Sequence, residues 1–487
     1  MGEKTLITTR FAVAEPDDVV VATFARTWVV RGFAHVLANV ATATESLVLT
    51  LACCVASAVV AEEASAPSAE RGKEAVWSVA SPLSMSVNSW NTIWKQWQLA
   101  DRPQDFDRLA QDRYGLLPSP RRDDRFPLGI NELKTVVGPV LSNNCLLCHA
   151  GRIAGQTVIG LGNASLDFQS LQEDLAAREL LPIKLPFKMG NGRGIIEAGA
   201  GTTYLLQFRD AEMNLAPMRK LKFSDQLCHD LPAWWLLKFK KTMYHGGLAD
   251  TRSTRSGVSF FLAPNNGAEF IKQQEAVLAD IREYLLTLEA PKYPFAIDRA
   301  LAARGEPVFV KNCSECHGTY GAERHYPNRI VPVDEVGTDP ALATFDGSSD
   351  LDYYKASWLY RDTGPNGEPY QMLNHGGYQA PPLDGVWATA PYFHNASVPT
   401  IADVLDTKTR PAFFTRSFDT DEAAYDQQRV GWKITRLEPD TAKRTAAHEQ
   451  RRITNTSLPG RGNQGHTFGD KLTPDQRKAV LEYLKTL

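Results

Sequence analysis

Two short segments of the chain have the residue types and spacing needed for covalent cofactor attachment. Each contains two cysteines three positions apart with a histidine directly after the second, in NNCLLCHA at 143–150 and in KNCSECHG at 311–318. In a C-x-x-C-H unit the two thiols add to the two vinyl groups of one haem, and the adjacent imidazole binds the iron. The sequence therefore predicts two covalently bound haem c groups. The attachment residues are Cys145, Cys148 and His149 for the first, and Cys313, Cys316 and His317 for the second.

Other uses of such cysteines fit the sequence less well. A structural zinc site needs a second nearby pair of cysteine or histidine ligands, and neither motif has one close by in the sequence. The seven cysteines are not a disulfide framework either, because each pair is followed directly by histidine. Cys228 is left alone, and we expect it to be unmodified.

The remaining histidines are candidates for a sixth, distal iron ligand, with Met372 as an alternative. His466 is favoured because it lies in GRGNQGHTFGDKL at 460–472, directly before the last amphipathic segment of the chain. A cytochrome c places its distal loop at this point. The sequence therefore predicts that His466 is the sixth ligand of one haem.

The elements that must position these residues form an internal repeat. IREYLLTL at 281–288 follows the first motif, and VLEYLKTL at 480–487 follows the second. Thr473, Pro474 and Gln476 predict the start of the final helix, as N-cap, first helical residue and capping-box partner. We therefore expect a mainly α, loop-rich fold of two tandem cytochrome-c-like domains, with the haems facing a shared interface.

The expected domain boundaries follow from composition and from the proline-rich joint before the second motif. They are an N-terminal extension plus signal peptide at 1–61, a linker at 62–74, an N-terminal haem domain at 75–294 and a C-terminal haem domain at 295–487.

The stretch at 47–61 is uncharged and apolar, and small residues that suit a cleavage site follow it. About 15 apolar residues suit a signal peptide and fall short of the roughly 20 needed to span a bilayer. We expect export, a periplasmic or secreted location and no stable membrane span. A buried helix or an uncleaved anchor stays open as an alternative, because 46 residues precede the stretch.

The bulk composition narrows the classes of partner. The chain has 487 residues, 43% of them apolar and 22% charged, as in ordinary soluble proteins. Its net charge of −3 shows no excess of basic residues of the kind that binds nucleic acid, so we expect no nucleic-acid partner.

The segment GVWATAPYFHNASVPTIADVL at 385–405 resembles the P-Y-x-H-[DN]-[GA]-x-x-x-T-[LI] block of the bacterial diheme cytochrome c peroxidase superfamily. Within it the chain is most similar to the rubber-oxygenase-like branch. That likeness rests on GLGNASLDFQ (160–169), LPAWWLLKFKKTMYHGG (231–247), YPNRIVPVDEVGTDPA (326–341) and GNQGHTFGDKL (462–472).

The resemblance implies a division of labour between the haems. The N-terminal haem, on His149, would react with peroxide or dioxygen through an open or exchangeable sixth position. The C-terminal haem, on His317, would be six-coordinate and relay electrons. An aromatic residue would lie between them. The segment 243–246 aligns with the family's F-W-D-G, which makes Tyr244 the bridge with His245 beside it, and Trp235 is the alternative bridge.

The chain departs from the peroxidase pattern at two places, and the resemblance also implies a second kind of metal site. Lys408 stands where the peroxidases have an axial methionine, which again points to His466. The family's distal Gln and Glu have no match here, so an acid–base group for peroxide cleavage is not expected at those positions. The resemblance also implies a calcium ion held by Asp230 and the carbonyls of Thr389 and Pro391, although Asp230 could be an ordinary cap.

We therefore predict an exported diheme oxidoreductase that acts on peroxide, or on dioxygen with an organic substrate, and exchanges electrons with a small redox protein. A non-catalytic electron-transfer cytochrome with both haems six-coordinate is the alternative. A radical-relay enzyme that oxidises another protein is a third hypothesis.

Overall fold

The computed structural model describes residues 66–487. Short gaps in the description fall at 80, 122–123, 136–137, 181–184, 186, 223–226, 228, 264–265, 346–347, 371–372, 374 and 444–446. The predicted signal segment, Cys228 and Met372 lie outside the described residues.

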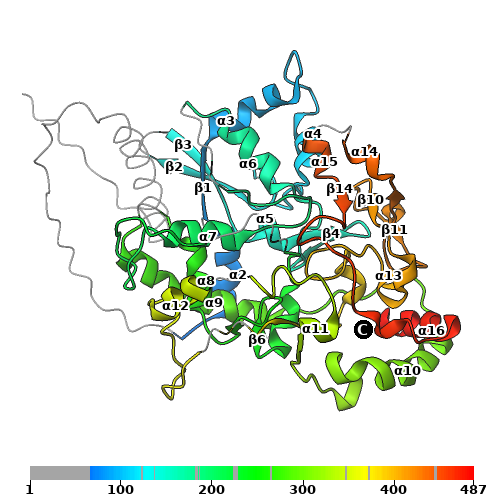
Figure 1. The fold of residues 1–487 in the computed structure, drawn as a ribbon. Helices are drawn as coiled ribbons and strands as arrows, with labels where there is room; N and C mark the ends of the chain where they lie inside the picture. Colours follow the sequence, from blue (N-terminus) through cyan, green and yellow to red (C-terminus); the bar gives the residue numbers. More distant parts are fainter. Residues whose placement is uncertain are drawn as a thin grey trace, which may run out of the picture.

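The described part is rich in short helices and loops, which confirms the expected class (Figure 1). The α-helices are α2 (Ala69–Ser78), α3 (Val87–Thr92), α4 (Phe106–Tyr114), α5 (Leu146–His149), α6 (Phe168–Ala176), α7 (Ala198–Leu206), α8 (Arg255–Val258), α9 (Ala268–Thr287), α10 (Arg299–His317), α11 (Val333–Val336), α12 (Ser348–Ala356), α13 (Ile401–Leu405), α14 (Pro439–Lys443), α15 (Ala447–Gln450) and α16 (Pro474–Leu484). Single 3-10 turns are η1 (Ile93–Trp97), η2 (Trp234–Phe239), η3 (Ser259–Phe261), η4 (Gly321–Glu323), η5 (Val386–Ala388), η6 (Thr407–Thr409), η7 (Glu422–Ala424) and η8 (Thr467–Gly469).

Small antiparallel sheets, which the sequence did not predict, connect the helices. They comprise β1 (Ser81–Ser86), β3 (Gly138–Asn143) and β2 (Ile130–Thr135) in that order; β13 (Thr435–Arg436), β10 (Phe413–Thr415) and β14 (Ile453–Asn455); and the pairs β4 (Ala150–Ile153) with β5 (Gln156–Ile159), β6 (Thr242–Met243) with β7 (Ala249–Asp250), β8 (Ile330–Pro332) with β9 (Gly377–Gln379), and β11 (Tyr425–Asp426) with β12 (Gly431–Trp432). Two sequence-local hairpins, β2–β3 and β4–β5, flank the first C-x-x-C-H motif.

Two pairs of helices cross in close backbone contact, and in each pair a glycine stands at the crossing point. A Cβ added to Gly305 of α10 would lie 1.9 Å from the carbonyl oxygen of Ala479 in α16, and one added to Gly72 of α2 would lie 1.9 Å from that of Asp280 in α9. Only glycine permits such backbone contact. Figure 1 shows α10 and α16 side by side at one end of the molecule. The predicted capping box at Thr473 is present, which confirms the start of α16.

The helix α2 corrects one boundary. It begins at Ala69, inside the predicted linker 62–74, because Ser68 caps it and Arg71 forms a 2.7 Å ion pair with Asp280 of α9. An Ala/Ser/Glu composition suggested a linker, but the close helix crossing at Gly72 supplies the packing that composition alone does not reveal.

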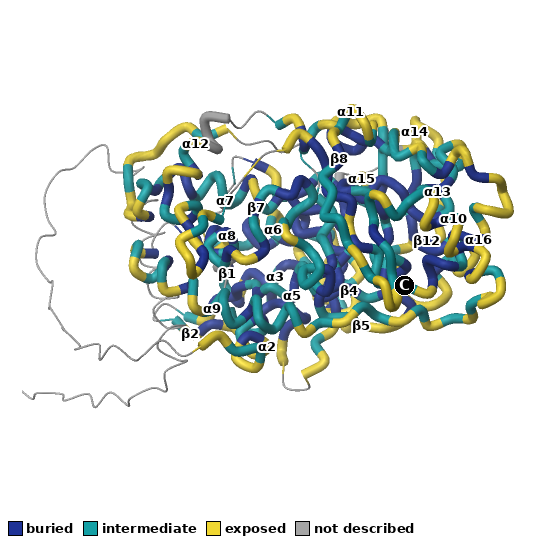
Figure 2. The backbone as a smooth tube through the Cα atoms, turned by 90° about the horizontal axis from the view of Figure 1, so that it is seen from below, coloured by how far each residue is buried: buried dark blue, intermediate teal, exposed yellow. Residues whose placement is uncertain are grey.

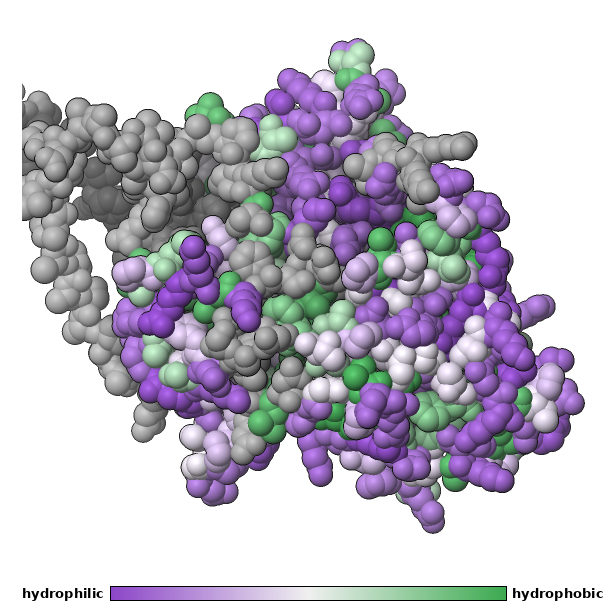
Figure 3. Space-filling model, viewed as in Figure 1, coloured by the Kyte–Doolittle hydropathy of each residue, from purple (hydrophilic) through white to green (hydrophobic). Residues whose placement is uncertain are grey.

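The buried residues form several clusters, and the largest one includes residues from both sides of position 295. Trp235 and Leu161 pack there with Phe309 and Trp387. Figure 2 shows this buried interior running through the middle of an elongated body. The face shown in Figure 3 is mostly hydrophilic, with small scattered apolar groups. Among residues 66–487, outside the gaps, no helix has the length and apolar character to cross a bilayer.

Candidate haem-attachment sites

The second C-x-x-C-H motif lies at the end of α10. The carboxylate of Asp298 caps the start of this helix, and Cys313, Cys316 and His317 occupy its last turns. The Nδ1 of His317 lies 2.8 Å from the carbonyl oxygen of Pro381. A ring N–H donated to a backbone carbonyl fixes the tautomer and leaves Nε2 as the metal-binding nitrogen. Burial lowers the pKa of His317, which keeps the imidazole neutral as a ligand must be.

His466 faces this ligand. The ring centres of His317 and His466 are 6.2 Å apart. Two metal–nitrogen bonds of about 2 Å, added to about 1 Å from each nitrogen to its ring centre, span about 6 Å. Burial, together with the nearby His317 and Arg410, lowers the pKa of His466 to about 3, so its imidazole is also neutral at pH 7. The pair has the separation of two axial ligands of one iron.

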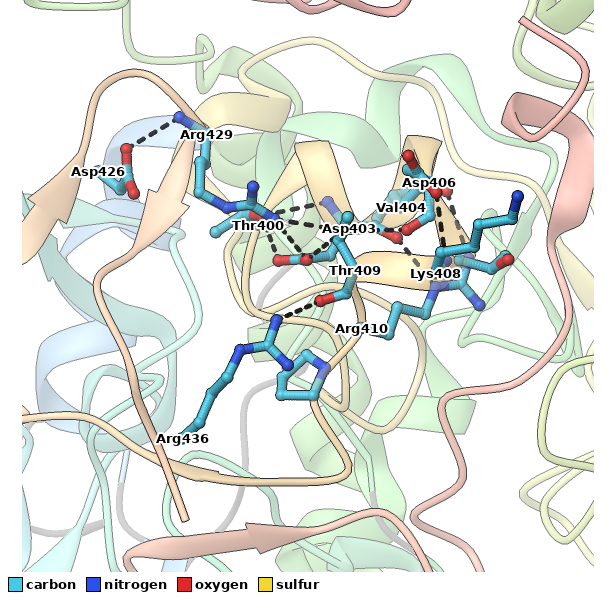
Figure 4. A network of polar contacts seen from close by, with 12 residues as sticks. Thr400, Asp403, Val404, Asp406, Lys408, Thr409, Arg410, Asp426, Arg429 and Arg436 are labelled. Atoms are coloured by element: carbon cyan, nitrogen blue, oxygen red, sulfur yellow. Dashed lines mark hydrogen bonds and ion pairs between the residues drawn. The ribbon is translucent and has the colours of Figure 1, made fainter. Parts of the chain in front are cut away.

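Arg410, one of the residues of the polar network in Figure 4, also holds the loop that carries His466. Arg410 donates from Nη1 to the carbonyl oxygens of Asn463 at 2.6 Å and Gly465 at 2.7 Å. Its Nη2 lies 3.3 Å from the carbonyl oxygen of His466 itself. The loop is therefore tied to the residues that follow α13.

The carboxylate at the centre of Figure 4 is Asp403, which is 2% exposed. It accepts hydrogen bonds from Arg429 at 2.6 Å and from the hydroxyl of Thr409 at 2.7 Å, while its backbone carbonyl accepts from Arg410. Lys408 has its backbone N–H bound to Asp406 in this network. Its side chain is not placed opposite His317, where His466 lies.

The first C-x-x-C-H motif forms the short helix α5 between two hairpins. The ring of His149 stacks on Trp234, with centres 4.5 Å apart and planes 20° apart. Its Nδ1 is buried and has no hydrogen-bond partner among the described residues. Burial lowers the pKa of His149 to about 4 and raises the pKa of the Cys145 and Cys148 thiols to about 11 and 12.

The two motifs therefore fit haem c. Each brings two neutral thiols and a half-buried, neutral imidazole to one place, and a distal imidazole is available at the second motif. The described part of the chain contains no group of three or more His, Cys, Asp or Glu side chains arranged to hold a metal ion.

The proposed bridging residues differ in where they point. Trp235 is fully buried, and its indole N–H donates to the carbonyl oxygen of Asp384 at 2.8 Å. Asp384 follows Pro381, the partner of His317, by three residues. The neighbour of Trp235 in sequence is Trp234, which stacks on His149. Adjacent tryptophans therefore contact the structure around both haem ligands.

Tyr244 and His245 point elsewhere. Tyr244 has a positive φ of 66°, and burial raises the pKa of its phenol, whose hydroxyl contacts Ser256. His245 places Nε2 2.8 Å from the carbonyl oxygen of Asp230. Neither residue belongs to the shared core that contains Trp235.

A cluster of buried ionisable groups surrounds Asp230. The ring of His245 lies 6.3 Å from that of His229 and 6.4 Å from that of His394. His229 Nε2 is 3.2 Å from a carboxylate oxygen of Glu197, in poor hydrogen-bond geometry. Burial lowers the pKa of His229 to about 3 and raises the pKa of Glu197 to about 8. No motif in the sequence points to Glu197 as a member of this cluster.

The backbone of Asp230 is hydrogen-bonded to the segment that also contains the other two predicted calcium ligands, Thr389 and Pro391. The N–H of Asp230 donates to the carbonyl oxygen of His394 at 2.7 Å, three residues beyond Pro391. The carboxyl of Asp230 forms no ion pair within the described residues, and burial raises its pKa well above the ordinary value. Thr389 donates its hydroxyl to Val386 and leaves its own carbonyl available. A cation would offset the buried carboxylate.

Comparison with known proteins places one segment in a described family. Residues 377–415 match the model described as RoxA-like, cytochrome c-like. This segment contains Pro381, the partner of His317, and Arg410, which holds the His466 loop. This segment of the chain is therefore similar to a cytochrome c-like domain.

Two curated relatives come from Sinorhizobium fredii. Uncharacterized protein y4iJ is 31% identical over 267 residues, which cover 41% of this chain and 41% of that protein. Uncharacterized protein y4iM is 30% identical over 234 residues, which cover 42% of this chain and 53% of that protein. The chain thus spans about two fifths to half the length of the curated relatives it matches.

A solved structure of hydrazine synthase from Kuenenia stuttgartiensis, pressurised with xenon, has 13% sequence identity and a TM-score of 0.26. The match covers 62% of this chain and 89% of that one. A likeness this weak carries no argument about fold or function.

Proposed function

We propose that the chain is an exported c-type cytochrome with two covalently bound haems, and that it acts as an oxidoreductase. The observation that carries the proposal is the facing pair His317 and His466, 6.2 Å apart, beside a C-x-x-C-H motif. Two strong axial ligands close an iron to substrates and suit it to electron transfer. We therefore assign the relay of electrons to the C-terminal haem.

The N-terminal site differs in a way that supports a reactive haem. Among the described residues the aromatic ring in contact with His149 is Trp234, and no second imidazole is paired with it. Haem bound there would supply one-electron and oxygen chemistry. The residues of this chain would bind it, keep its surroundings apolar and orient His149 through the Trp234 stack. Peroxide or dioxygen is the proposed reactant.

Trp234 and Trp235 form the proposed electron route between the two sites. Trp234 contacts the ligand of the first haem, and Trp235 donates to Asp384 in the segment that also holds His317. Tyr244 is less well placed for this role, because its hydroxyl contacts Ser256 and the residue does not belong to the buried cluster that contains Trp235. His245 is engaged with a backbone carbonyl, so we assign it a structural role.

The finer features follow from the resemblance. The RoxA-like match at 377–415 supports a place in the rubber-oxygenase-like branch, in which dioxygen and an organic substrate would react at the first site. Asp230, Thr389 and Pro391 would hold calcium, and the buried carboxyl of Asp230 supports this assignment. The segment at 47–61 would direct the chain to the periplasm or the exterior, where a small redox protein would exchange electrons with it.

The test is an electron paramagnetic resonance spectrum of the purified ferric protein. One low-spin haem with two histidine ligands and one high-spin haem are expected. Two low-spin haems would instead establish the electron-transfer cytochrome, in which neither iron is open. A dioxygen-bound ferrous haem in the isolated protein would favour the oxygenase over the peroxidase.

A further inference from the structure

A small cavity lies between segments from the two halves of the chain, and we call it the junction cavity. Its volume is about 20 Å³, which is room for about one water-sized group. Five arginines line it, together with Pro391, Asn395 and Phe418: Arg193, Arg416, Arg451, Arg452 and Arg461. The lining is therefore rich in positive charge.

Two of these arginines have carboxylate partners. Arg451 lies 3.2 Å from Asp167, and Arg452 lies 3.5 Å from Glu449. Their charges are compensated within the protein. Arg452 is also the more solvent-exposed of the two, at 28% of its side chain.

Arg193 and Arg416 differ from that pair. They are only 8% and 7% exposed, and neither forms an ion pair in the part of the chain that the structure describes. Arg193 donates to the carbonyl oxygens of Ser165 and Asp112, and Arg416 donates to Ala164 and to the Ser165 hydroxyl. All of these partners are uncharged, so neither guanidinium is in direct contact with a carboxylate among the described residues, and the acids that act on them, such as Asp167 on Arg193 and Asp419 on Arg416, do so from a longer distance.

Each of the two guanidinium groups also has an unused donor. The Nη1 atoms of Arg193 and Arg416 are buried and have no hydrogen-bond partner among the described residues. Both guanidinium carbons lie 4.3 Å from the ring centre of Phe418, which keeps the like charges close together. Burial lowers the pKa of Arg193 to about 9, and Arg193 and Arg452 both lower the pKa of Arg416. A buried, unpaired charge with an unused donor is strongly unfavourable.

We propose that Arg193 and Arg416 bind one small anion in the junction cavity, and that this anion joins the two halves of the chain. The anion supplies a negative charge in direct contact with them and accepts from the two unused Nη1 donors. Because Arg193 precedes position 295 and Arg416 follows it, the site is complete only when both halves are in place.

Two sources have the required chemistry, a free halide and a carboxylate of a haem propionate. The free halide fits the cavity volume directly. A haem propionate is the second source because the cavity lies near the first attachment motif. Ala164 lines the cavity, and the N–H of the preceding residue, Asn163, donates to the carbonyl oxygen of Cys148 at 2.8 Å. The cavity is thus one residue removed from a contact with the first attachment motif. Only this second source depends on haem being bound.

The first experiment uses the unmodified, haem-loaded protein crystallised in bromide. An anomalous peak between the Nη1 atoms of Arg193 and Arg416 shows a free anion. Electron density that runs from a porphyrin into the cavity, without a bromide peak, shows a propionate. A water molecule, a side chain of the protein or no density at that point overturns the proposal.

The second experiment compares Arg416→Met with the matched control Arg452→Met, which alters a carboxylate-paired arginine of the same cavity. Chloride replaces gluconate at constant ionic strength. With a free anion, Tm rises in proportion to the logarithm of chloride concentration in the wild type and the control, and does not rise in Arg416→Met.

With a propionate, none of the three proteins responds to chloride, and the reduction potential of one haem becomes newly pH-dependent between about pH 5 and 8 in Arg416→Met alone. Identical behaviour of all three proteins in both measurements, or an equal loss in Arg452→Met, contradicts the assignment to Arg193 and Arg416.

Discussion

Replacing His466 with alanine should convert one of the two haems from low-spin to high-spin. The imidazole of His466 faces that of His317 at 6.2 Å between ring centres. An alanine methyl cannot bridge the gap, because two metal–nitrogen bonds of about 2 Å require a nitrogen at that point. All of the low-spin signal from the second site should therefore disappear, and the first site should be unchanged.

The substitution also removes packing. His466 contacts the rings of Phe468 and Phe393, with centres 5.2 and 5.9 Å away. Truncating this half-buried ring should lower the free energy of unfolding by about 1–3 kcal/mol. Low-temperature resonance spectra of the ferric protein measure the spin change, and urea unfolding measures the stability.

His394→Ala is the matched control, because it also removes an imidazole that packs on an aromatic ring, but that imidazole is buried against Tyr378 at 4.0 Å and does not face His317. Its ferric spectrum should match that of the wild type. His466→Met should keep the second haem low-spin and raise its reduction potential. An unaltered low-spin signal in His466→Ala would refute the ligand assignment, and loss of the signal in His394→Ala instead would give the role to His394.

Three further predictions concern the scaffold. Gly305→Ala should destabilise the protein by about 3 kcal/mol in urea unfolding, because its Cβ would lie 1.9 Å from the Ala479 carbonyl oxygen. Gly267→Ala, with nothing within 4 Å of the added Cβ, should change the stability little. Burial raises the pKa of Glu197 from 4.5 to about 8, so folding favours the protonated acid. The stability that the protonated side chain gives to the folded protein is fully present below pH 4.5 and is lost as the pH rises through 8, which lowers the free energy of unfolding by roughly 4–5 kcal/mol in all. Glu197→Gln should therefore be more stable than the wild type at pH 9 by that order and similar to it at pH 5, and a difference independent of pH would contradict the buried acid. Chelation of calcium should lower stability and activity, Asp230→Ala should show the same loss without a response to chelator, and protein free of calcium by elemental analysis would exclude this site.

The sequence predicts the attachment chemistry because C-x-x-C-H combines all the required groups within five residues. It also predicts the start of α16, since Thr473, Pro474 and Gln476 act locally. His466 was found from its place before the final helix, and the structure brings it opposite His317. In each case the relevant interaction either is local or follows from a regular order of elements.

Long-range contacts were not predictable in this way. Arg410 lies more than 50 residues before the loop carbonyls that it binds, and no spacing rule connects them. Arg193 and Arg416 are far apart in the chain and come together only in the fold, at Phe418 and Ser165. Trp234 stands in an apolar segment with no local pattern that marks it, and its stacking on His149 depends on the tertiary fold. The Gly72 and Gly305 crossings are visible in the sequence as repeated Arg-Gly pairs, a signal that could have placed α2 in the fold.

The most direct test of the account is the mass of the mature protein purified from a cell that attaches haem c, followed by peptide mapping. The account predicts a mass increase of two haems, with one on the peptide containing Cys145 and Cys148 and the other on the peptide containing Cys313 and Cys316. One haem, or none, in protein purified from cells that load a known c-type cytochrome fully would contradict it.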